Sequence, residues 1–261
     1  MAITRQGDAL TRAHRVQQQR IRVAAVQQAR SLVPLFNRSN PASTWGPWTR
    51  AMTATVNQGR SLSSRAAMSY YLQFRQAEGA KGLFLPIPAE PLEEIVVAEN
   101  LAKAIIPDGS KEAAYSRAVQ QLRDQRAEAA ALAETESMVA AAGAESIIAS
   151  TESDDQATTF ARVASANACA FCLMLESRGP VYQTIDAASF LPHLLCGCSP
   201  EPVMDTGEYR NDKAAESLDL YARSGGDINA MRRDLYAASD NTALNAARRE
   251  EYAAAKAAEQ A

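Results

Sequence analysis

Alanine content is the sequence feature that most constrains the fold of this chain. Alanine makes up about a fifth of the 261 residues and is concentrated in stretches that also contain Glu, Gln and Arg. Alanine has the highest helix propensity of all residues, and aromatic residues form only 6% of the sequence. We therefore expect a mainly α-helical protein. The longest such stretch, residues 111–150, predicts one helix that approaches about 60 Å, with Gly143 as a weak point.

Further helices are predicted from apolar residues at helical spacing and from residues that start or end helices. Trp45 and Trp48, on either side of Gly46-Pro47, are expected to anchor packing. The predicted helices cover residues 8–33, 47–77, 89–106, 211–223 and 227 to the C-terminus. A thin apolar stripe is expected to face the core in the first of them: Leu10, Val16, Ile21, Val23 and Val26.

Two segments depart from the helical pattern. In residues 82–91, GLFLPIPAEP, three prolines impose an extended backbone, which predicts a linker or a strap across a partner. In residues 158–204 the alanine runs thin out, which predicts a compact α+β unit. There, TTFARVA, PVYQT and EPVM are expected to form strands, and CAFCLMLES a helical turn.

Some classes of protein are excluded by composition. The sequence has no run of 18 apolar residues, so we expect no membrane span. Its first 20 residues contain no apolar core of the kind found in secretory signals. We find no phosphate-binding loop and no internal repeat.

Charge is distributed unevenly along the chain. Residues 1–82 contain 12 Lys or Arg and two acidic residues, whereas residues 83–261 contain 15 basic and 28 acidic residues. The net charge of −3 therefore conceals a basic front and an acidic rear. This asymmetry indicates either two surfaces with different partners or solvated helix faces.

The four cysteines and one of the two histidines fall within a window of thirty residues. The pattern is Cys169-x2-Cys172-x20-His193-x2-Cys196-x-Cys198. Thiolates and imidazoles are the usual ligands of a tetrahedral Zn²⁺ ion, so we expect a structural zinc site. Cys198 would then be a spare ligand or would replace Cys196 or His193.

Other interpretations of this cluster remain open. Disulfides or reduced buried cysteines would need no metal. A catalytic Cys–His pair is a third possibility, whereas a zinc deaminase is rejected because no Glu follows His193 in the required pattern. A serine triad would have to use His14 or His193, and neither has a nucleophile elbow nearby. We therefore assign no catalytic residue and no other cofactor-binding residue.

Two stretches within the cluster resemble a known family. FARVASANACAFCLMLESRGPVYQT and LPHLLCGCSPEPV are similar to the C-terminal module of phage Mu F-type (MuF-like) head morphogenesis proteins, in the version found in tailed phages of actinobacteria. Cys169 and Cys172 match the CxxC of that family, and His193, Cys196 and Cys198 match its His-x-x-Cys-x-Cys. The family usually has a basic residue between the last two cysteines, where this chain has Gly197. The resemblance covers about residues 158–204.

The residue patterns along the chain and this resemblance together predict a fold and a role. The fold would be mainly α with a small α+β C-terminal module: an extended helical arm and a compact Cys/His knob. The domains would be a basic helical arm (1–82), a long-helix region after the Pro-rich strap (83–157), the Cys/His module (158–206) and C-terminal helices (207–261).

The role implied is that of a structural, non-enzymatic minor capsid protein of a tailed bacteriophage. It would lie in the virion head, at the portal, after assembly in the host cytoplasm. Its partners would be the portal protein, the major capsid or scaffold protein, and packaged DNA through the basic arm, with no membrane involved. The alternatives are a capsid maturation protease and a DNA-contacting accessory head protein.

Overall fold

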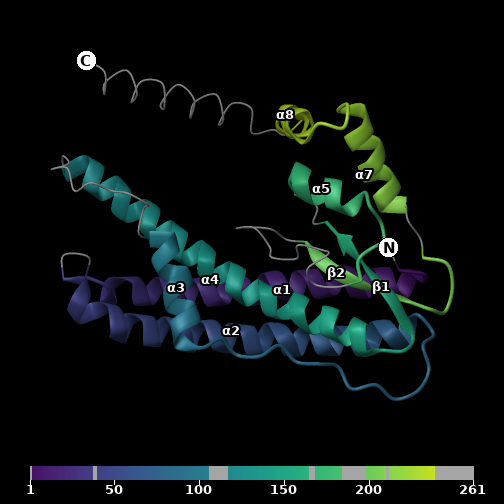
Figure 1. Ribbon diagram of the computed structural model, residues 1–261, viewed down its shortest axis with the longest axis horizontal. Helices are drawn as coiled ribbons and strands as arrows, with labels where there is room; N and C mark the ends of the chain where they lie inside the picture. Colours follow the sequence, from purple (N-terminus) through teal and green to yellow (C-terminus); the bar gives the residue numbers. More distant parts are fainter. Residues whose placement is uncertain are drawn as a thin grey trace. The chain divides into compact units, whose positions relative to one another are not determined.

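The structure is a computed structural model that describes residues 2–37, 40–105, 117–164, 168–183, 198–209 and 212–238. As predicted, the chain is mainly α-helical with a small antiparallel sheet (Figure 1). None of the helices in these ranges is long and apolar enough to span a membrane. The elements are α1 (Arg5–Leu32), the 3-10 helix η1 (Val33–Leu35), α2 (Pro41–Ala77), α3 (Glu94–Ile105), α4 (Arg117–Ser153), β1 (Ala157–Val163), α5 (Ala170–Glu176), β2 (Ser199–Met204), α7 (Asp212–Arg223) and α8 (Ile228–Ala238).

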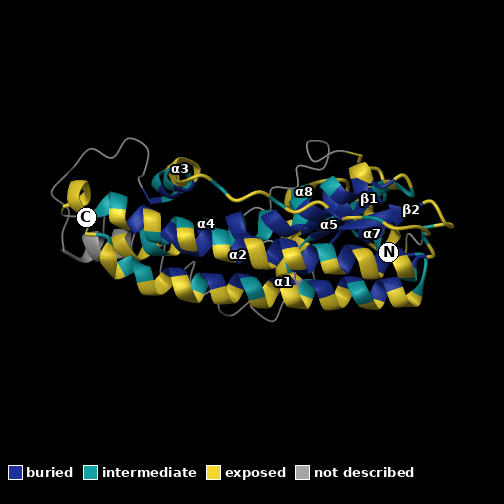
Figure 2. Cartoon of the chain, turned by 90° about the horizontal axis from the view of Figure 1, so that it is seen from below, coloured by how far each residue is buried: buried dark blue, intermediate teal, exposed yellow. Residues whose placement is uncertain are grey.

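Three long helices, α1, α2 and α4, lie side by side in the first of two compact units (Figure 2). They contain 28, 37 and 37 residues, which corresponds to lengths of about 42–56 Å. The short helix α3 packs against α2 and α4. The basic residues 1–82 therefore pack along α4.

Helix α2 begins at Pro41, six residues before the predicted start at Pro47. Proline is well tolerated in the first turn because the N–H it lacks has no intrahelical partner there. Pro47 lies in the second turn, where it removes one hydrogen bond. The Trp48 ring, 2% exposed, stacks on Phe36 with 5.0 Å between ring centroids, so the predicted packing anchor is confirmed.

The buried side of α1 is polar in its first half, contrary to the predicted apolar stripe. Val16 and Val23 are 53% and 44% exposed. The polar side chains can be buried because their partners on α2 and α4 are polar too. For example, Gln18 donates to the Ser63 carbonyl over 2.9 Å and accepts from the Ser63 hydroxyl over 2.6 Å. The buried residues of α1 include Asp8, Thr11, His14, Gln18, Arg22, Ala25 and Ala29.

Gly143 marks a close approach of the three long helices and not a weak point in α4. A Cβ atom at this position would lie 2.8 Å from Ser63 Oγ on α2 and 2.9 Å from Gln18 Nε2 on α1. Gly59 has the same role on α2, where a Cβ atom would lie 2.7 Å from a methyl group of Val139. These glycines let the helices approach more closely than any side chain would allow.

Ion pairs connect the basic first helices to the acidic α4 and to Asp154, the residue that follows it. Each pair joins an arginine of α1 or α2, at least nine-tenths buried, to a carboxylate of the later chain. Part of the charge asymmetry therefore serves contacts within the chain. The pairs are Arg22–Glu136 at 3.5 Å, Arg60–Glu145 at 2.6 Å and Arg75–Asp154 at 2.7 Å.

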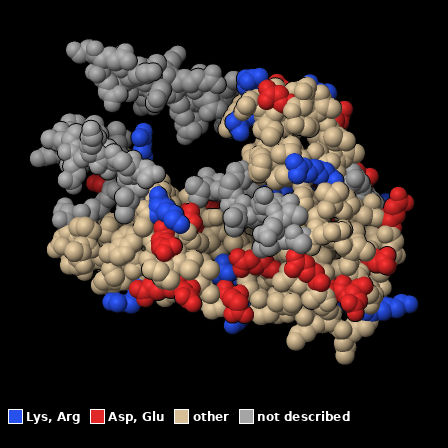
Figure 3. Space-filling view, in the orientation of Figure 1, with Lys and Arg blue, Asp and Glu red and all other residues tan. Residues whose placement is uncertain are grey.

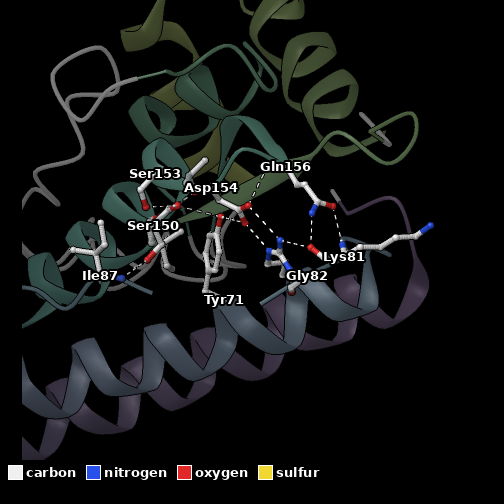
Figure 4. A network of polar contacts seen from close by, with 11 residues as sticks. Tyr71, Lys81, Gly82, Ile87, Ser150, Ser153, Asp154 and Gln156 are labelled. Carbon is white, nitrogen blue, oxygen red and sulfur yellow. Dashed lines mark hydrogen bonds and ion pairs between the residues drawn. The ribbon is translucent and has the colours of Figure 1, made fainter. Parts of the chain in front are cut away.

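The proline-rich strap, residues 82–91, runs over the helices of its own chain, so it is not a free linker (Figure 4). The Ile87 N–H donates to Ser150 Oγ over 2.9 Å, and the Ala89 N–H donates to Ser146 Oγ over 3.0 Å. At its start, the Arg75 guanidinium donates to the carbonyls of Lys81 and Gly82 over 2.6 and 2.9 Å. Serine hydroxyls and one arginine thus provide the partners that an extended backbone needs.

Strands β1 and β2 pair antiparallel, from Ala157 opposite Met204 to Val163 opposite Ser199. The predicted strands TTFARVA and EPVM are confirmed. The third expected strand, PVYQT, contributes a single bridge between Tyr182 and Phe160 in its described part. Phe160 and Tyr182 form a small core with Ile148 of α4, which places the sheet beside the C-terminal half of that helix.

The second compact unit contains α5, α7 and α8, which pack against one another. Within it, the Ser217 hydroxyl donates over 2.7 Å to the buried carboxylate of Glu176. The predicted helical turn CAFCLMLES is confirmed as α5. Strands β1 and β2 belong to the first unit and α5 to the second, so parts of the predicted 158–206 module fall in both. The end of the predicted last helix lies outside the described residues.

Candidate functional site

Cys169 and Cys172 lie together at the start of α5. Cys169 is the N-cap residue of this helix, and Cys172 lies in its first turn. Their sulfur atoms are 3.6 Å apart. The Cys169 side chain is exposed and the Cys172 side chain is buried. The CxxC spacing thus places two thiols on one side of a helical turn, with one of them accessible.

This separation fits two ligands of one metal ion. Two thiolates of a tetrahedral Zn²⁺ site with Zn–S bonds of about 2.3 Å lie about 3.8 Å apart. Of the other predicted ligands, Cys198 is half-buried immediately before β2, whereas His193 and Cys196 lie outside the described residues. In the described part of the chain, no cluster of three or more His, Cys, Asp or Glu side chains could hold a metal.

A second cluster, which the sequence analysis missed, lies inside the first unit. The Glu201 carboxylate on β2 is 1% exposed and accepts hydrogen bonds from the Thr11 hydroxyl and, over 3.0 Å, from the Tyr209 hydroxyl. The Thr11 hydroxyl also lies 2.8 Å from the Tyr70 hydroxyl. The His14 imidazole stacks on the Tyr70 ring with 4.4 Å between centroids. Strand β2 is thereby joined to α1 and α2.

Burial determines the ionisation of this cluster. Desolvation, followed by the Arg15 cation, lowers the pKa of His14 to about 3, so the imidazole is neutral at pH 7. Desolvation raises the pKa of Glu201 above its ordinary value, against hydrogen bonds from Thr11 and Tyr209 that lower it. Desolvation also raises the pKa of Tyr70, which keeps the phenol protonated. The His14 Nδ1 atom has no hydrogen-bond partner in the described structure.

Glu78 connects the two ends of the α1–α2 pair. Its carboxylate accepts from the Ile3 N–H over 2.6 Å and from the Thr4 hydroxyl over 2.6 Å. The Thr4 hydroxyl oxygen in turn caps α1 by accepting from the Gly7 N–H over 2.9 Å. Gly7 is required here, since a Cβ atom at this position would collide with Glu78 Oε1 and would lie 2.6 Å from the Cβ atom of Ala2. The start of α1 is therefore held by the residue that ends α2.

The sequence patterns used above do not predict the Glu201 cluster. Thr11 and His14 lie on the helix side that the apolar stripe assigned to solvent, and Glu201 lies between two prolines in a strand whose residues are all buried. One usable signal was the i, i+3 spacing of Thr11 and His14 with Asp8, which places short polar side chains on one side of α1.

Comparison with known proteins identifies the family. The family model described as VG15 protein matches residues 4–224, which is most of the chain. No curated protein and no solved structure shows a significant match. The chain therefore belongs to the VG15 family and is a phage protein.

Proposed function

We propose that this VG15-family phage protein is a structural minor head protein that docks on the portal and carries out no catalysis. The proposal joins the family match to the resemblance of residues 158–204 to MuF-like head morphogenesis proteins. It places the chain in the virion head, with the portal protein as its principal partner.

The observation that carries the proposal is the structural use of the reactive groups in the first unit. His14 is 3% exposed, its pKa is far below neutrality, and its imidazole stacks on the ring of Tyr70. The Thr11 hydroxyl is bonded to Glu201, and the Tyr70 phenol is buried with a raised pKa. These contacts join α1, α2 and β2, which supports a structural role for the groups that make them.

The CxxC pair fits the same role. We propose that Cys169 and Cys172 bind one structural Zn²⁺ ion together with two of His193, Cys196 and Cys198. A metal that closes so small a unit adds folding free energy that a limited core lacks. These residues would hold the metal, and no chemical step is assigned to it.

Purified heads provide the test. Quantitative mass spectrometry and labelling of a tagged chain should find it in heads in few copies, at the portal vertex. Heads assembled with His14→Phe or Cys172→Ser chains should contain capsid and scaffold proteins with unaltered termini.

Two results would contradict the proposal. The first is absence of the chain from both procapsids and mature heads. The second is loss of processing of another head protein in a variant whose thermal unfolding matches that of the wild type, which would support the protease alternative.

A further inference from the structure

Two opposite sides of the first unit carry complementary surfaces. The first, which we name the arginine face, consists of exposed residues on α1: Arg5, Arg12, Val16, Arg20, Val23 and Arg30. With 3.6 residues per turn, these positions fall within about 80° of one side of the helix. They extend over 25 residue steps, which is about 38 Å.

Positive charge on this face is not offset by neighbouring carboxylates of the same helices. Helices α1 and α2 together contain one acidic residue, Asp8, and it is buried. The buried arginines of these helices pair with carboxylates of α4 or with Asp154 just after it, whereas the arginines of the arginine face lie on the side of α1 opposite its buried residues. Val16 and Val23 add exposed apolar area between the cations.

The second surface, which we name the acidic ridge, runs along the strap into α3. Its apolar residues are unusually exposed for a segment whose backbone is held so firmly: Leu83 is 106% exposed, Leu85 84% and Ile95 60%. Residues 82–100 contain four glutamates and no Lys or Arg. In Figure 3, acidic side chains gather on the face over which α3 and the strap run. The acidic ridge consists of Leu83, Leu85, Ile87, Glu90, Glu93, Glu94, Ile95 and Glu99.

We infer that the arginine face of one copy binds the acidic ridge of a second copy of this chain. Both surfaces combine exposed aliphatic side chains with charges of a single sign, and the signs are opposite. Figure 2 shows α3 and the strap along one side of the bundle and α1 along the other, so one chain cannot satisfy both surfaces itself. A contact between two different surfaces is heterologous, and it extends from copy to copy, either closing a ring or growing into an open filament.

The size of the surfaces sets the strength of the contact. A helix face about 38 Å long and about 10 Å wide covers about 400 Å², whereas a stable interface buries about 800 Å² per partner. Association of the purified protein is therefore weak and concentration-dependent. Because the charges are exposed, it weakens further as salt shortens the Debye length.

Sedimentation of the full-length chain tests this inference. Over a concentration series up to several hundred micromolar in low salt, the average mass should rise above 28.1 kDa and fall again in 0.5 M NaCl. The variant Arg12→Glu/Arg20→Glu should remain monomeric, and so should Glu90→Lys/Glu93→Lys. The matched control, Arg50→Glu/Arg65→Glu, reverses two exposed arginines of α2 outside the arginine face and should associate like the wild type.

The decisive measurement mixes the two reversed chains. Each variant repels itself, but every face of one is complementary to a face of the other, so an equimolar mixture should associate again. A wild-type chain that is monomeric throughout, or a mixture that stays monomeric, would overturn the inference. So would a monomeric chain that binds a 30-base-pair DNA duplex through Arg12 and Arg20, because the arginine face would then be a nucleic-acid surface. This outcome is independent of whether the chain is found in phage heads.

Discussion

Replacing Arg75 by methionine removes the cation beside Asp154, one of the most deeply buried carboxylates in the first unit. The Arg75 Nε atom donates to Asp154 Oδ2 over 2.7 Å, and the two side chains are 8% and 2% exposed. The Tyr71 hydroxyl, at 3.1 Å from Asp154 Oδ2, is too weak a donor to replace a full positive charge (Figure 4). The variant therefore leaves a buried carboxylate without a counter-charge.

The magnitude follows from this burial. Removing one partner of a buried ion pair costs about 3–5 kcal/mol, because the remaining charge stays out of water without compensation. Arg75 also supplies the hydrogen bonds to the Lys81 and Gly82 carbonyls that fix the start of the strap. For a chain of this size, the loss should lower the melting temperature by about 6–20 °C.

Urea unfolding followed by circular dichroism measures the effect. Arg65→Met is the matched control, since Arg65 is exposed on the same helix, and it should change stability by less than about 0.5 kcal/mol. In the double variant Arg75→Met/Asp154→Asn, the decrease in the free energy of unfolding should be smaller than the sum of the decreases in the two single variants. If Arg75→Met is as stable as Arg65→Met, the ion pair does not stabilise the fold in the way argued.

Three further predictions concern the glycines, the buried histidine and the cysteines. Gly143→Ala should destabilise the chain by about 1–3 kcal/mol, because the new Cβ atom contacts Ser63 and Gln18. Gly46→Ala, whose Cβ atom would have no neighbour within 4 Å, should stabilise the chain by about 0.5–1 kcal/mol. Unfolding curves that rank the two variants the other way would contradict the close approach of the helices. The pKa of His14 is about 3 in the folded chain, below its unfolded value of about 6.5. The stability that the neutral imidazole provides is therefore complete above pH 6.5 and is lost as the pH falls towards 3. Relative to His14→Phe, the free energy of unfolding of the wild type should fall by up to about 1.4 kcal/mol per pH unit in that window. Equal pH dependence of the two unfolding free energies would refute this. Metal analysis of the purified chain should find about one zinc per chain, lost in Cys172→Ser, whereas no metal together with cysteines that resist alkylation until reduced would indicate disulfides.

Composition and local signals were sufficient for the helices and for the two strands. The alanine-rich stretches, Pro34 after α1, and Gly79 after α2 mark element ends that the structure confirms to within a few residues. These features act within one or two turns of the chain, so a single sequence contains them in full.

Contacts between residues that are distant along the chain could not be predicted from the sequence in this way. Which side of α1 faces inward depends on Ser63, Tyr70 and Glu201, which lie 45 to 190 residues away along the chain. The polar partners reverse the rule that apolar residues face the core. The role of Gly143 likewise depends on the approach of two other helices, and a propensity scale contains no such information.

The separation of the ion pairs along the chain has a consequence for synthesis on the ribosome. Arg75 and Asp154 are 79 residues apart. At a translation rate of about 5–20 residues per second, Asp154 is therefore synthesised about 4–16 s after Arg75. During that interval the emerging chain is a strongly cationic pair of helices whose inner side is lined with uncompensated guanidinium groups. Stable tertiary structure of the first unit is therefore a late event in synthesis, which requires α4 and Asp154 to have emerged.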